Sequence, residues 1–333
     1  MSVPSPRDTK LVMCVQFHFS FWRIPPELPA AVRNRLPDMR VVHLDSYDAL
    51  PAELPDTDIF VGFNLLPDQL AAARKLRWIH VTAAGVAQLM RPDVQASGIT
   101  VTNSRGIHAI PMAEHTMGML LALSRKLPAT VRFQDELNWA QQEIWELRPA
   151  ELHGATLLIV GFGAIGTELA RRARAFNMRI QAVTRSGRGD TSLADRIYPA
   201  SELMKALPQA DYVVLAAPDT PDSKRMIGVQ ELKTMKPTAY LLNIARGTLI
   251  DESALADALE RNVIAGAALD VAEKEPLAPE SPLWKLKNVF ITPHTSSVSE
   301  RLWPRQTELV LENLDRWFAG RELINKVDFA QGY

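Results

Sequence analysis

The sequence predicts an α/β protein with two domains, each a doubly wound parallel sheet with helices on both faces. Two observations carry this prediction. The chain has 333 residues, of which 47% are apolar, which is too long for one ordinary core and enough for two. Short apolar runs also alternate with helix-length segments almost from end to end, a pattern typical of parallel strands joined by crossover helices.

The first series of strands is expected within residues 10–103. Its apolar runs are LVMCVQF, RVVHL, DIFVG, RWIHV and ITVTN, separated by turn residues and short amphipathic stretches. Residues 109–127, AIPMAEHTMGMLLALSRKL, then predict a long helix that is apolar on nearly every face. We expect this helix to be buried between domains or between subunits and to join the two halves of the chain.

The second series of strands follows this helix. Strands are expected at ATLLIVG, RIQAV, DYVVLAA, TAYLLNI, VIAGAAL and NVFITP. From Ser299 the pattern ERLWPRQTELVLENLDRWFAG is helical again, and we expect it to return to the first domain. The expected division is therefore 1–103 with 300–333 as one domain and 104–299 as the other, inserted within it.

Charge, cysteine content and the N-terminus restrict the possible partners. The formal net charge is −1, so no long-range field favours nucleic acid or an anionic membrane. The single cysteine, Cys14, lies in an apolar run and fits a small core residue in a reducing compartment. The polar, Pro-rich N-terminus lacks the apolar segment of a signal peptide, and no apolar span of 18 residues occurs. We expect a cytoplasmic protein that binds small molecules.

A glycine-rich turn follows the strand ATLLIVG and precedes a helix. Gly161 permits the tight turn, Gly163 the close approach of a pyrophosphate, and Gly166 close packing of helix on strand. The helix that begins at Ala164 offers free N–H groups and its positive dipole end to phosphates. In this context the turn predicts a dinucleotide-binding (Rossmann) domain. The expected binding residues of the turn are Gly161, Phe162, Gly163, Ala164, Ile165 and Gly166.

The end of the next strand distinguishes the two nicotinamide dinucleotides. An acid about 20 residues after the turn normally binds the ribose 2′-OH of NAD, but this chain has Thr184, Arg185 and Ser186 there. A guanidinium beside two hydroxyls can hold a 2′-phosphate by charge-assisted hydrogen bonds. We therefore expect NADP(H) to be preferred, whereas NAD(H) is possible if these are solvated loop residues.

Three polar residues follow strands of the second domain: Arg246 in LLNIARGTL, Glu275 in ALDVAEKEPL and His294 in VFITPHTSS. In an open parallel sheet, ligands gather outside the carboxyl ends of the strands, so these loops can converge. Histidine suits proton transfer to or from an alcohol, a carboxylate can orient its ring, and arginine can grip a carboxylate and polarise a carbonyl. Each also has a plainer reading as an ion-pair, turn or loop residue, and spacing alone leaves the two open.

The chain resembles the D-isomer-specific 2-hydroxyacid dehydrogenase family, in its NADP-preferring, glyoxylate/hydroxypyruvate reductase-like branch. The resemblance runs from about Leu76 to Tyr333 and rests on AAGV, AEHTMGMLLAL, GFGAIG, LLNIARG, GAALDVAEKEPL and ITPHTSS, in family order and spacing. It implies a Rossmann cofactor domain inserted into a flavodoxin-like substrate domain. It also implies homodimers that pair through the cofactor domain, and reversible NADPH-dependent reduction of a 2-oxo acid to a D-2-hydroxy acid.

The same resemblance assigns roles to individual residues. Arg246 would bind substrate, His294 would be the acid/base and Glu275 its partner. The residues implied at the nicotinamide end are Ala217, Pro218, Ala245, Arg246, Asp270 and His294. The residues implied at the substrate are Arg246, Ser297 and the backbone N–H groups of Ala84, Gly85 and Val86, which would face its carboxylate.

Several points stay open in the sequence. His108 stands where the family often places a polar active-site residue, but it equally fits a histidine at a helix start, and His115 within the helix fits a structural or interfacial role. The histidines show no spacing typical of a metal site, so none is expected. The loops that hold Phe21, Trp22, Phe63 and Leu65 suggest either an apolar substrate pocket or core, and small acids such as glyoxylate and hydroxypyruvate remain candidates. The alternative function is a corepressor-like protein that senses NAD(P)(H) without turnover.

Overall fold

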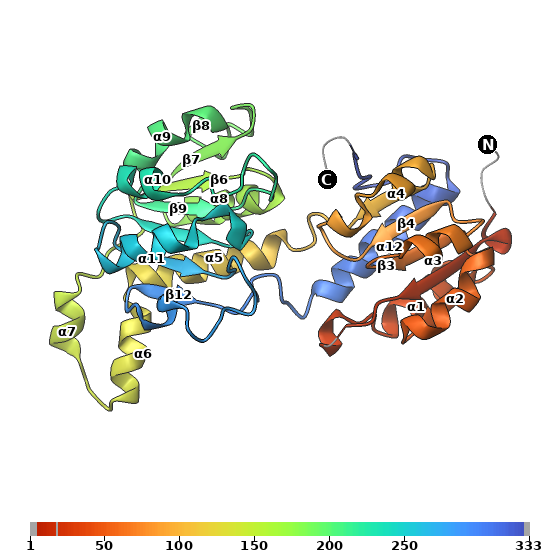
Figure 1. Cartoon of the computed structure of the whole chain (residues 1–333), viewed down its shortest axis with the longest axis horizontal. Helices are drawn as coiled ribbons and strands as arrows, with labels where there is room; N and C mark the ends of the chain where they lie inside the picture. The colour runs from red at the N-terminus through yellow and green to blue at the C-terminus, as the bar shows by residue number, and fades with distance from the viewer. Residues whose placement is uncertain (1–4, 18, 330–333) are drawn as a thin grey trace. The chain divides into compact units, whose positions relative to one another are not determined.

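The computed structural model describes residues 5–17 and 19–329, and the chain forms two compact units (Figure 1). Unit 1 comprises 1–107 and 299–333, and unit 2 comprises 108–298. The sequence placed the boundaries at 103/104 and 299/300. Residues 1–4, 18 and 330–333 of the predicted first domain lie outside the described residues. No helix in the described part of the chain is long and apolar enough to cross a membrane.

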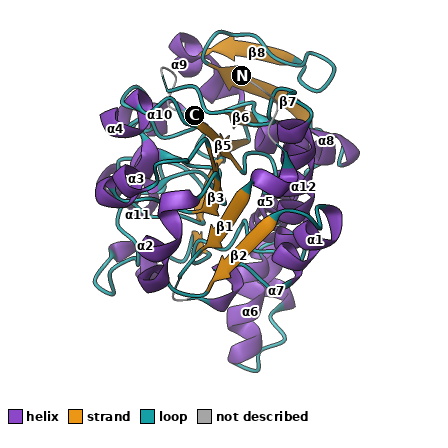
Figure 2. Cartoon of the chain, turned by 90° about the vertical axis from the view of Figure 1, so that its right-hand side faces the viewer, coloured by secondary structure: helices purple, strands orange, loops and turns teal. Residues whose placement is uncertain are grey.

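Unit 1 has a five-stranded parallel sheet with the order β2-β1-β3-β4-β5, the flavodoxin-like order (Figure 2). Its strands are β1 (Lys10–Cys14), β2 (Arg40–Leu44), β3 (Ile59–Gly62), β4 (Trp78–Val81) and β5 (Thr100–Asn103). Its helices are α1 (Glu27–Arg35), α2 (Leu50–Glu53), α3 (Pro67–Ala72), α4 (Pro92–Ala96) and α12 (Leu302–Phe318). All pairings are parallel, as the sequence predicts.

Helices cover both faces of this sheet because the strands are apolar on both sides. Val12 and Cys14 of β1 point into a core shared with α2, α3 and α4, whereas Leu11 and Met13 point into a second core. The second core contains side chains of α1 and α12. Figure 2 shows these two groups of helices on opposite sides of the strands. The C-terminal helix α12 therefore packs on unit 1.

Unit 2 has a seven-stranded parallel sheet with the order β12-β11-β10-β9-β6-β7-β8. Its strands are β6 (Thr156–Val160), β7 (Arg179–Thr184), β8 (Arg196–Pro199), β9 (Tyr212–Leu215), β10 (Tyr240–Asn243), β11 (Gly266–Leu269) and β12 (Val289–Ile291). Its helices are α5 (Ala109–Ser124), α6 (Leu127–Asp135), α7 (Gln141–Glu146), α8 (Ala164–Ala175), α9 (Leu203–Ala206), α10 (Val229–Thr234) and α11 (Glu252–Glu260). The first strand of the unit, β6, lies inside the sheet between β9 and β7, as in dinucleotide-binding folds.

The two faces of this sheet are also covered. Leu158 and Val160 of β6 point into a core with α9, α10 and α11, and Leu157 and Ile159 point into a core with α5 and α8. The α/β fold with two parallel, doubly wound sheets is therefore confirmed. Helix α5 was predicted to be buried between domains or between subunits; in unit 2 it contributes Leu120 to the core that it shares with α8.

The sequence missed one strand and overextended one helix. β8 is a short edge strand that pairs with β7 and ends in Pro199, so its four residues give little apolar signal. The helix expected over 109–127 ends at Ser124, because Lys126 adopts a left-handed conformation with φ 60°. A new helix, α6, then begins with Pro128 in its first turn.

Candidate active site

The predicted cofactor and catalytic loops of unit 2 open on one edge of its sheet. Strands β6, β9, β10, β11 and β12 run parallel, so the loops that follow them leave from the same, carboxyl edge. These loops carry the glycine turn after β6, Ala217 and Pro218 after β9, Arg246 after β10, Asp270 and Glu275 after β11, and His294 after β12. The order of strands reverses between β6 and β9: β7 and β8 follow on one side of β6, and β9 to β12 follow on the other. In open α/β sheets ligands bind at such a switch point.

The glycine turn is shaped by close backbone contacts. Gly161 has φ +99°, and a Cβ there would lie 2.5 Å from the backbone nitrogen of Ala217. A Cβ on Gly166 would lie 2.3 Å from the carbonyl oxygen of Gly161. By contrast, a Cβ on Gly163 would meet nothing within 4 Å. Gly161 and Gly166 are thus required by the turn itself, whereas the space over Gly163 is open and fits the approach of a pyrophosphate.

Helix α8 begins directly after Gly163, which is its N-cap. The first intrahelical bond is that from the Thr167 N–H to the Gly163 carbonyl, so the N–H groups of 164–166 are left for another acceptor. No acidic side chain lies in the first turn of this 12-residue helix. The helix end therefore presents donors and a positive dipole where a phosphate would sit.

The loop after β7 has no carboxylate at its start. The Thr184 hydroxyl donates to the carbonyl of Arg188 at 3.0 Å. This hydrogen bond closes a tight loop, on which the side chains of Arg185 and Ser186 are exposed. Asp190, the next acid in the chain, accepts hydrogen bonds from both the amide and the hydroxyl of Ser192. Thr184 therefore shapes the loop, while the exposed guanidinium and hydroxyl beside it fit a phosphate.

His294 and Glu275 form a direct pair. The imidazole Nδ1 lies 2.6 Å from Oε2 of Glu275, and the other carboxylate oxygen, Oε1, accepts the amide of Ala272 at 3.2 Å. A carboxylate can only accept, so Nδ1 is the protonated nitrogen of the neutral ring, and Nε2 carries the lone pair. No hydrogen bond of Nε2 is found within the described residues, and the His294 side chain is 47% exposed. The pair thus presents Nε2 for proton exchange with a ligand.

The backbone of His294 is left-handed, with φ 54°. Such a conformation costs a non-glycine residue about 1–2 kcal/mol and persists where the surroundings hold it. The His294 amide donates to the carbonyls of Asp270, at 2.8 Å, and of Thr292, at 3.0 Å. On the following residues, the amides of Thr295 and Ser296 donate to the Asp270 carboxylate at 2.9 and 3.0 Å. Asp270 therefore holds the loop on both sides of His294.

The Asp270 carboxylate is itself fully enclosed. Burial raises the pKa of Asp270, but hydrogen bonds from Ser296, Thr292 and Thr295 together lower it by more. The pKa of Asp270 therefore lies below its ordinary value. An ionised carboxylate with three donors is a satisfied buried charge. Its hydrogen bonds come from Thr292, Thr295 and Ser296 of the His294 loop.

Arg246 stands at the start of a short 3₁₀ turn after β10. Asn243, at the end of β10, holds this turn: its amide donates to the Arg246 carbonyl at 2.8 Å, and its side-chain oxygen accepts the amide of Ala245 at 3.0 Å. The next residue, Gly247, packs so tightly that a Cβ would lie 1.9 Å from the carbonyl carbon of Ala272. The Arg246 loop therefore abuts the loop that carries Glu275.

The structure brings some predicted residues together and leaves others apart. Glu275 and His294 are bonded, whereas the Arg246 guanidinium donates to the adjacent Ala245 carbonyl at 2.7 Å. Among the described residues, no hydrogen bond or ion pair joins the Arg246 side chain to Glu275 or His294. Ser297 is half-buried and follows the loop that Asp270 holds.

The remaining predicted residues lie elsewhere. Ala84, Gly85 and Val86 belong to unit 1, in the loop after β4, where the Ala84 carbonyl accepts from Asn103 at 2.8 Å. His108 is the N-cap of α5 and is buried.

The sequence singled out neither Asn243 nor the contact that His115 makes. Asn243 is a polar residue at the end of a buried apolar strand, which is a usable signal because a buried amide needs partners. For His115 the sequence indicates a structural or interfacial role, and its Nε2 lies 3.0 Å from the hydroxyl of Thr292, two residues before His294. Nothing in the spacing of these two residues indicates that contact.

The fold and this edge define a nicotinamide-dinucleotide-dependent dehydrogenase: a Rossmann-type sheet, a glycine turn at its switch point, and a carboxylate-paired histidine beyond the same strand ends. The family model described as "D-isomer specific 2-hydroxyacid dehydrogenase, NAD binding domain" matches residues 117–296. The chain belongs to the D-isomer specific 2-hydroxyacid dehydrogenase family and is an NAD(P)-dependent oxidoreductase.

Individual relatives cover nearly the whole chain. A glyoxylate reductase of Pyrococcus furiosus is 35% identical over 321 residues, which span 93% of this chain and 90% of the relative. A D-isomer specific 2-hydroxyacid dehydrogenase family protein from Aeromonas salmonicida aligns with a TM-score of 0.80 at 31% identity, over 97% of this chain and 99% of the other. An NADPH-dependent glyoxylate/hydroxypyruvate reductase from Sinorhizobium meliloti, in complex with NADP and malonate, aligns with a TM-score of 0.75 at 28% identity, over 97% of each chain.

Proposed function

We propose that the protein reduces a 2-oxo acid to a D-2-hydroxy acid with NADPH, reversibly, and that His294 is the acid/base. The observation that supports this proposal is the 2.6 Å contact between His294 Nδ1 and Glu275, which leaves Nε2 for a substrate oxygen. The names of relatives, which include glyoxylate reductases and an NADPH-dependent glyoxylate/hydroxypyruvate reductase, support the same reaction class.

The glycine turn 161–166 and the loop of Arg185 are the residues that would hold the dinucleotide. When bound, the nicotinamide supplies the hydride for C2 of the oxo acid. In reduction the charged ring of His294 donates its Nε2 proton to the carbonyl oxygen and becomes neutral, and in oxidation the neutral ring takes the hydroxyl proton at Nε2. Glu275 orients the ring and stabilises its charged form, and Arg246 binds the substrate carboxylate and polarises the carbonyl.

The acid/base role is tested by His294→Ala. We expect kcat to fall at least about a hundredfold while NADPH binding, measured by fluorescence titration, is retained, because proton transfer contributes that much to turnover. His153→Ala, at an exposed histidine of the same unit, is the matched control. A near-normal rate in His294→Ala would remove the mechanism. NADPH binding without turnover of any 2-oxo acid by the unaltered protein would instead favour a sensor.

The preference for NADPH is proposed from Arg185 and Ser186, whose side chains are exposed beside the end of β7. A charge-assisted hydrogen bond to the 2′-phosphate contributes about 1.5–3 kcal/mol. Arg185→Ala should therefore raise the KM for NADPH about tenfold or more and leave the KM for NADH unchanged. Arg261→Ala, which removes an exposed arginine of α11's C-cap, is the control. A lower KM for NADH than for NADPH in the unaltered protein contradicts the proposal.

The substrate class is best separated by a panel of 2-oxo acids. Glyoxylate and hydroxypyruvate are the small candidates, and 2-oxo acids with bulky apolar side chains are the others. Within unit 1, Leu65 belongs to the core, whereas Phe21 and Phe63 are exposed to about 39% and 42%. The side chains of the two phenylalanines are therefore accessible for contact with a bulky apolar substrate, whereas the side chain of Leu65 is not.

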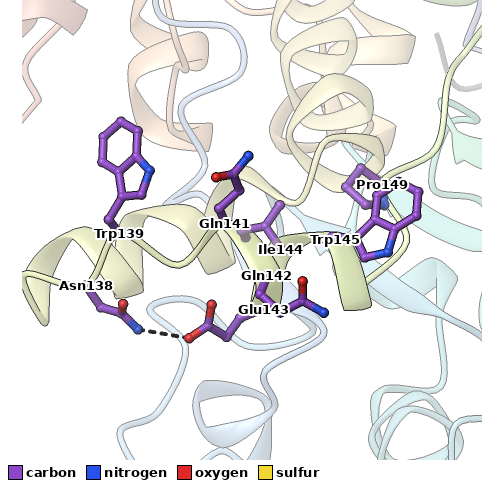
Figure 3. Close-up of a pocket in the computed structure, with 8 residues that line it drawn as sticks. All are labelled: Asn138, Trp139, Gln141, Gln142, Glu143, Ile144, Trp145 and Pro149. Atoms are coloured by element: carbon purple, nitrogen blue, oxygen red, sulfur yellow. Dashed lines mark hydrogen bonds between the residues drawn. The ribbon is translucent and has the colours of Figure 1, made fainter.

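We propose that the protein is a homodimer that pairs through unit 2. Helices α6 and α7 extend outside the layers of that unit (Figure 1). Their segment exposes Leu137 by 96% and Trp139 by 93%, and exposed apolar groups of this size mark contact surfaces. The hollow in Figure 3 lies on this segment, and the Trp139 ring stands apart from the other labelled side chains. Trp139→Glu should convert a dimer to a monomer in light scattering, whereas a monomeric unaltered protein contradicts the proposal.

A further inference from the structure

A chain of hydrogen bonds links helix α5 to the loop of His294. Nε2 of His115, on α5, lies 3.0 Å from the hydroxyl oxygen of Thr292, and that hydroxyl lies 2.6 Å from Oδ1 of Asp270. His115 itself is 3.7 Å from the same carboxylate oxygen. Helix α5 thereby reaches the carboxylate that holds the His294 loop.

The directions of these bonds follow from the acceptor at the end of the chain. The Asp270 carboxylate is ionised and can only accept, so the Thr292 hydroxyl donates its proton to Asp270. The Thr292 oxygen is then an acceptor toward His115, and His115 Nε2 carries a proton. The hydrogen bonds thus run from His115 Nε2–H to the Thr292 hydroxyl and from that hydroxyl to the Asp270 carboxylate.

Helix α5 is a firm support for this chain. It shares a core with α8, the helix of the glycine turn, through Ala113 and Met117 on its own side and Leu169 and Ala173 on the other. Glu114, the residue before His115, also forms an ion pair with Arg172 of α8 at 3.1 Å. Neighbouring residues of one helix therefore contact the helix after the glycine turn and the loop of His294.

We propose that His115 is a positioning residue for His294, acting through the hydroxyl of Thr292 and the carboxylate of Asp270. The inference rests on the proposed acid/base function of His294. The physical reason is that the left-handed backbone of His294 is held by Asp270 and Thr292, so their placement decides where Nε2 lies. Displacement of a reacting group by about 1 Å can reduce turnover a hundredfold.

The test compares pairs of variants at His115 and Thr292, two members of the hydrogen-bonded chain. His115→Leu and Thr292→Val remove the hydrogen bonds, whereas His115→Gln and Thr292→Ser retain a polar group at the same place. We expect kcat to fall about tenfold in the first pair, with the KM for the oxo acid and the Kd for NADPH within about twofold of the unaltered protein. The second pair should recover most of the rate. The kcat of the double variant His115→Leu/Thr292→Val should be no lower than that of either single variant, because both substitutions break the same chain of hydrogen bonds.

A readout that does not depend on turnover follows the same loop. Hydrogen exchange of the amides of 294–296, whose acceptors belong to Asp270 and Thr292, should be about tenfold faster in Thr292→Val. Thr116→Val is the matched control, since it removes a hydroxyl from the adjacent position of α5 that bonds within the helix. It should change neither kcat nor the exchange of 294–296.

The outcomes separate this inference from the proposed function. Loss of activity in His294→Ala, with unchanged kcat and exchange in both His115→Leu and Thr292→Val, overturns the positioning role and leaves the acid/base role intact. The positioning role is also overturned if, in His115→Leu and Thr292→Val, the Kd for NADPH rises by the same factor as kcat falls. That result indicates a general loosening of unit 2. Retained activity in His294→Ala overturns the proposed function, whatever the exchange of 294–296 shows.

Discussion

Mild acid should destabilise the protein through one buried histidine of unit 1. His80 on β4 is fully buried, with Nδ1 at 2.8 Å from the Thr102 hydroxyl and Nε2 at 2.8 Å from the Gln306 side chain. Burial lowers the pKa of His80 from 6.5 to about 3. Between these two values the unfolded chain binds a proton that the folded chain does not. The free energy of unfolding contributed by this group is therefore unaffected above the unfolded pKa and falls as the pH decreases from 6.5 toward 3.

The magnitude follows from the proton count. One proton taken up on unfolding changes the free energy of unfolding by about 1.4 kcal/mol per pH unit. Between pH 6.5 and about pH 5 the loss is about 2 kcal/mol, which is a substantial part of the roughly 5–15 kcal/mol typical of a domain. Most carboxylates stay ionised in this interval, so the histidine contribution is not masked.

Urea unfolding at a series of pH values measures this effect. Tryptophan fluorescence follows unfolding, and in unit 1 it includes Trp78, which stacks on Trp317 with ring centroids 5.6 Å apart. His80→Gln cannot take up the proton and should flatten the slope between about pH 5 and 6.5, whatever its stability at neutral pH. His43→Gln, on β2 of the same sheet, is the matched control. Equal slopes in the unaltered protein and in His80→Gln would refute the reasoning.

Two further predictions concern packing. Gly166→Ala places a Cβ 2.3 Å from the Gly161 carbonyl oxygen, so both the melting temperature and NADPH affinity should fall, whereas Gly163→Ala, with open space around it, should keep its melting temperature and lose NADPH affinity. Unchanged melting of Gly166→Ala in calorimetry would contradict the role of this contact. Burial, and secondarily the charge of Asp45, raises the pKa of Cys14 to about 12. Iodoacetamide at about pH 8 should therefore label Cys14 in the denatured but not the native protein, as mass spectrometry would show, because the thiolate is the nucleophile.

Much of the fold could be predicted because its signals are local. Within residues 5–17 and 19–329, apolar runs marked eleven strands, and the strand that they missed, Arg196–Pro199, is an edge strand of four residues with a terminal proline. The helix predicted over 109–127 was too long because the left-handed turn at Lys126 is not visible in an apolar pattern. Among the three predicted catalytic residues, Arg246, Glu275 and His294, the sequence prediction paired Glu275 with His294. The structure places a carboxylate oxygen of Glu275 2.6 Å from Nδ1 of His294.

The sequence by itself determined the parallel α/β architecture, the glycine turn and the family, because each depends on residue types at short, regular spacing. The tertiary structure alone decided how the His294 loop is held. His115 and Thr292 are 177 residues apart, and their contact exists because α5 packs beside the strands that carry the loop. The enclosure of Asp270 has the same origin, since its three donors come from a different strand connection. Hydrogen-bond partners across a sheet are set by packing, and local sequence patterns do not encode which residues will meet.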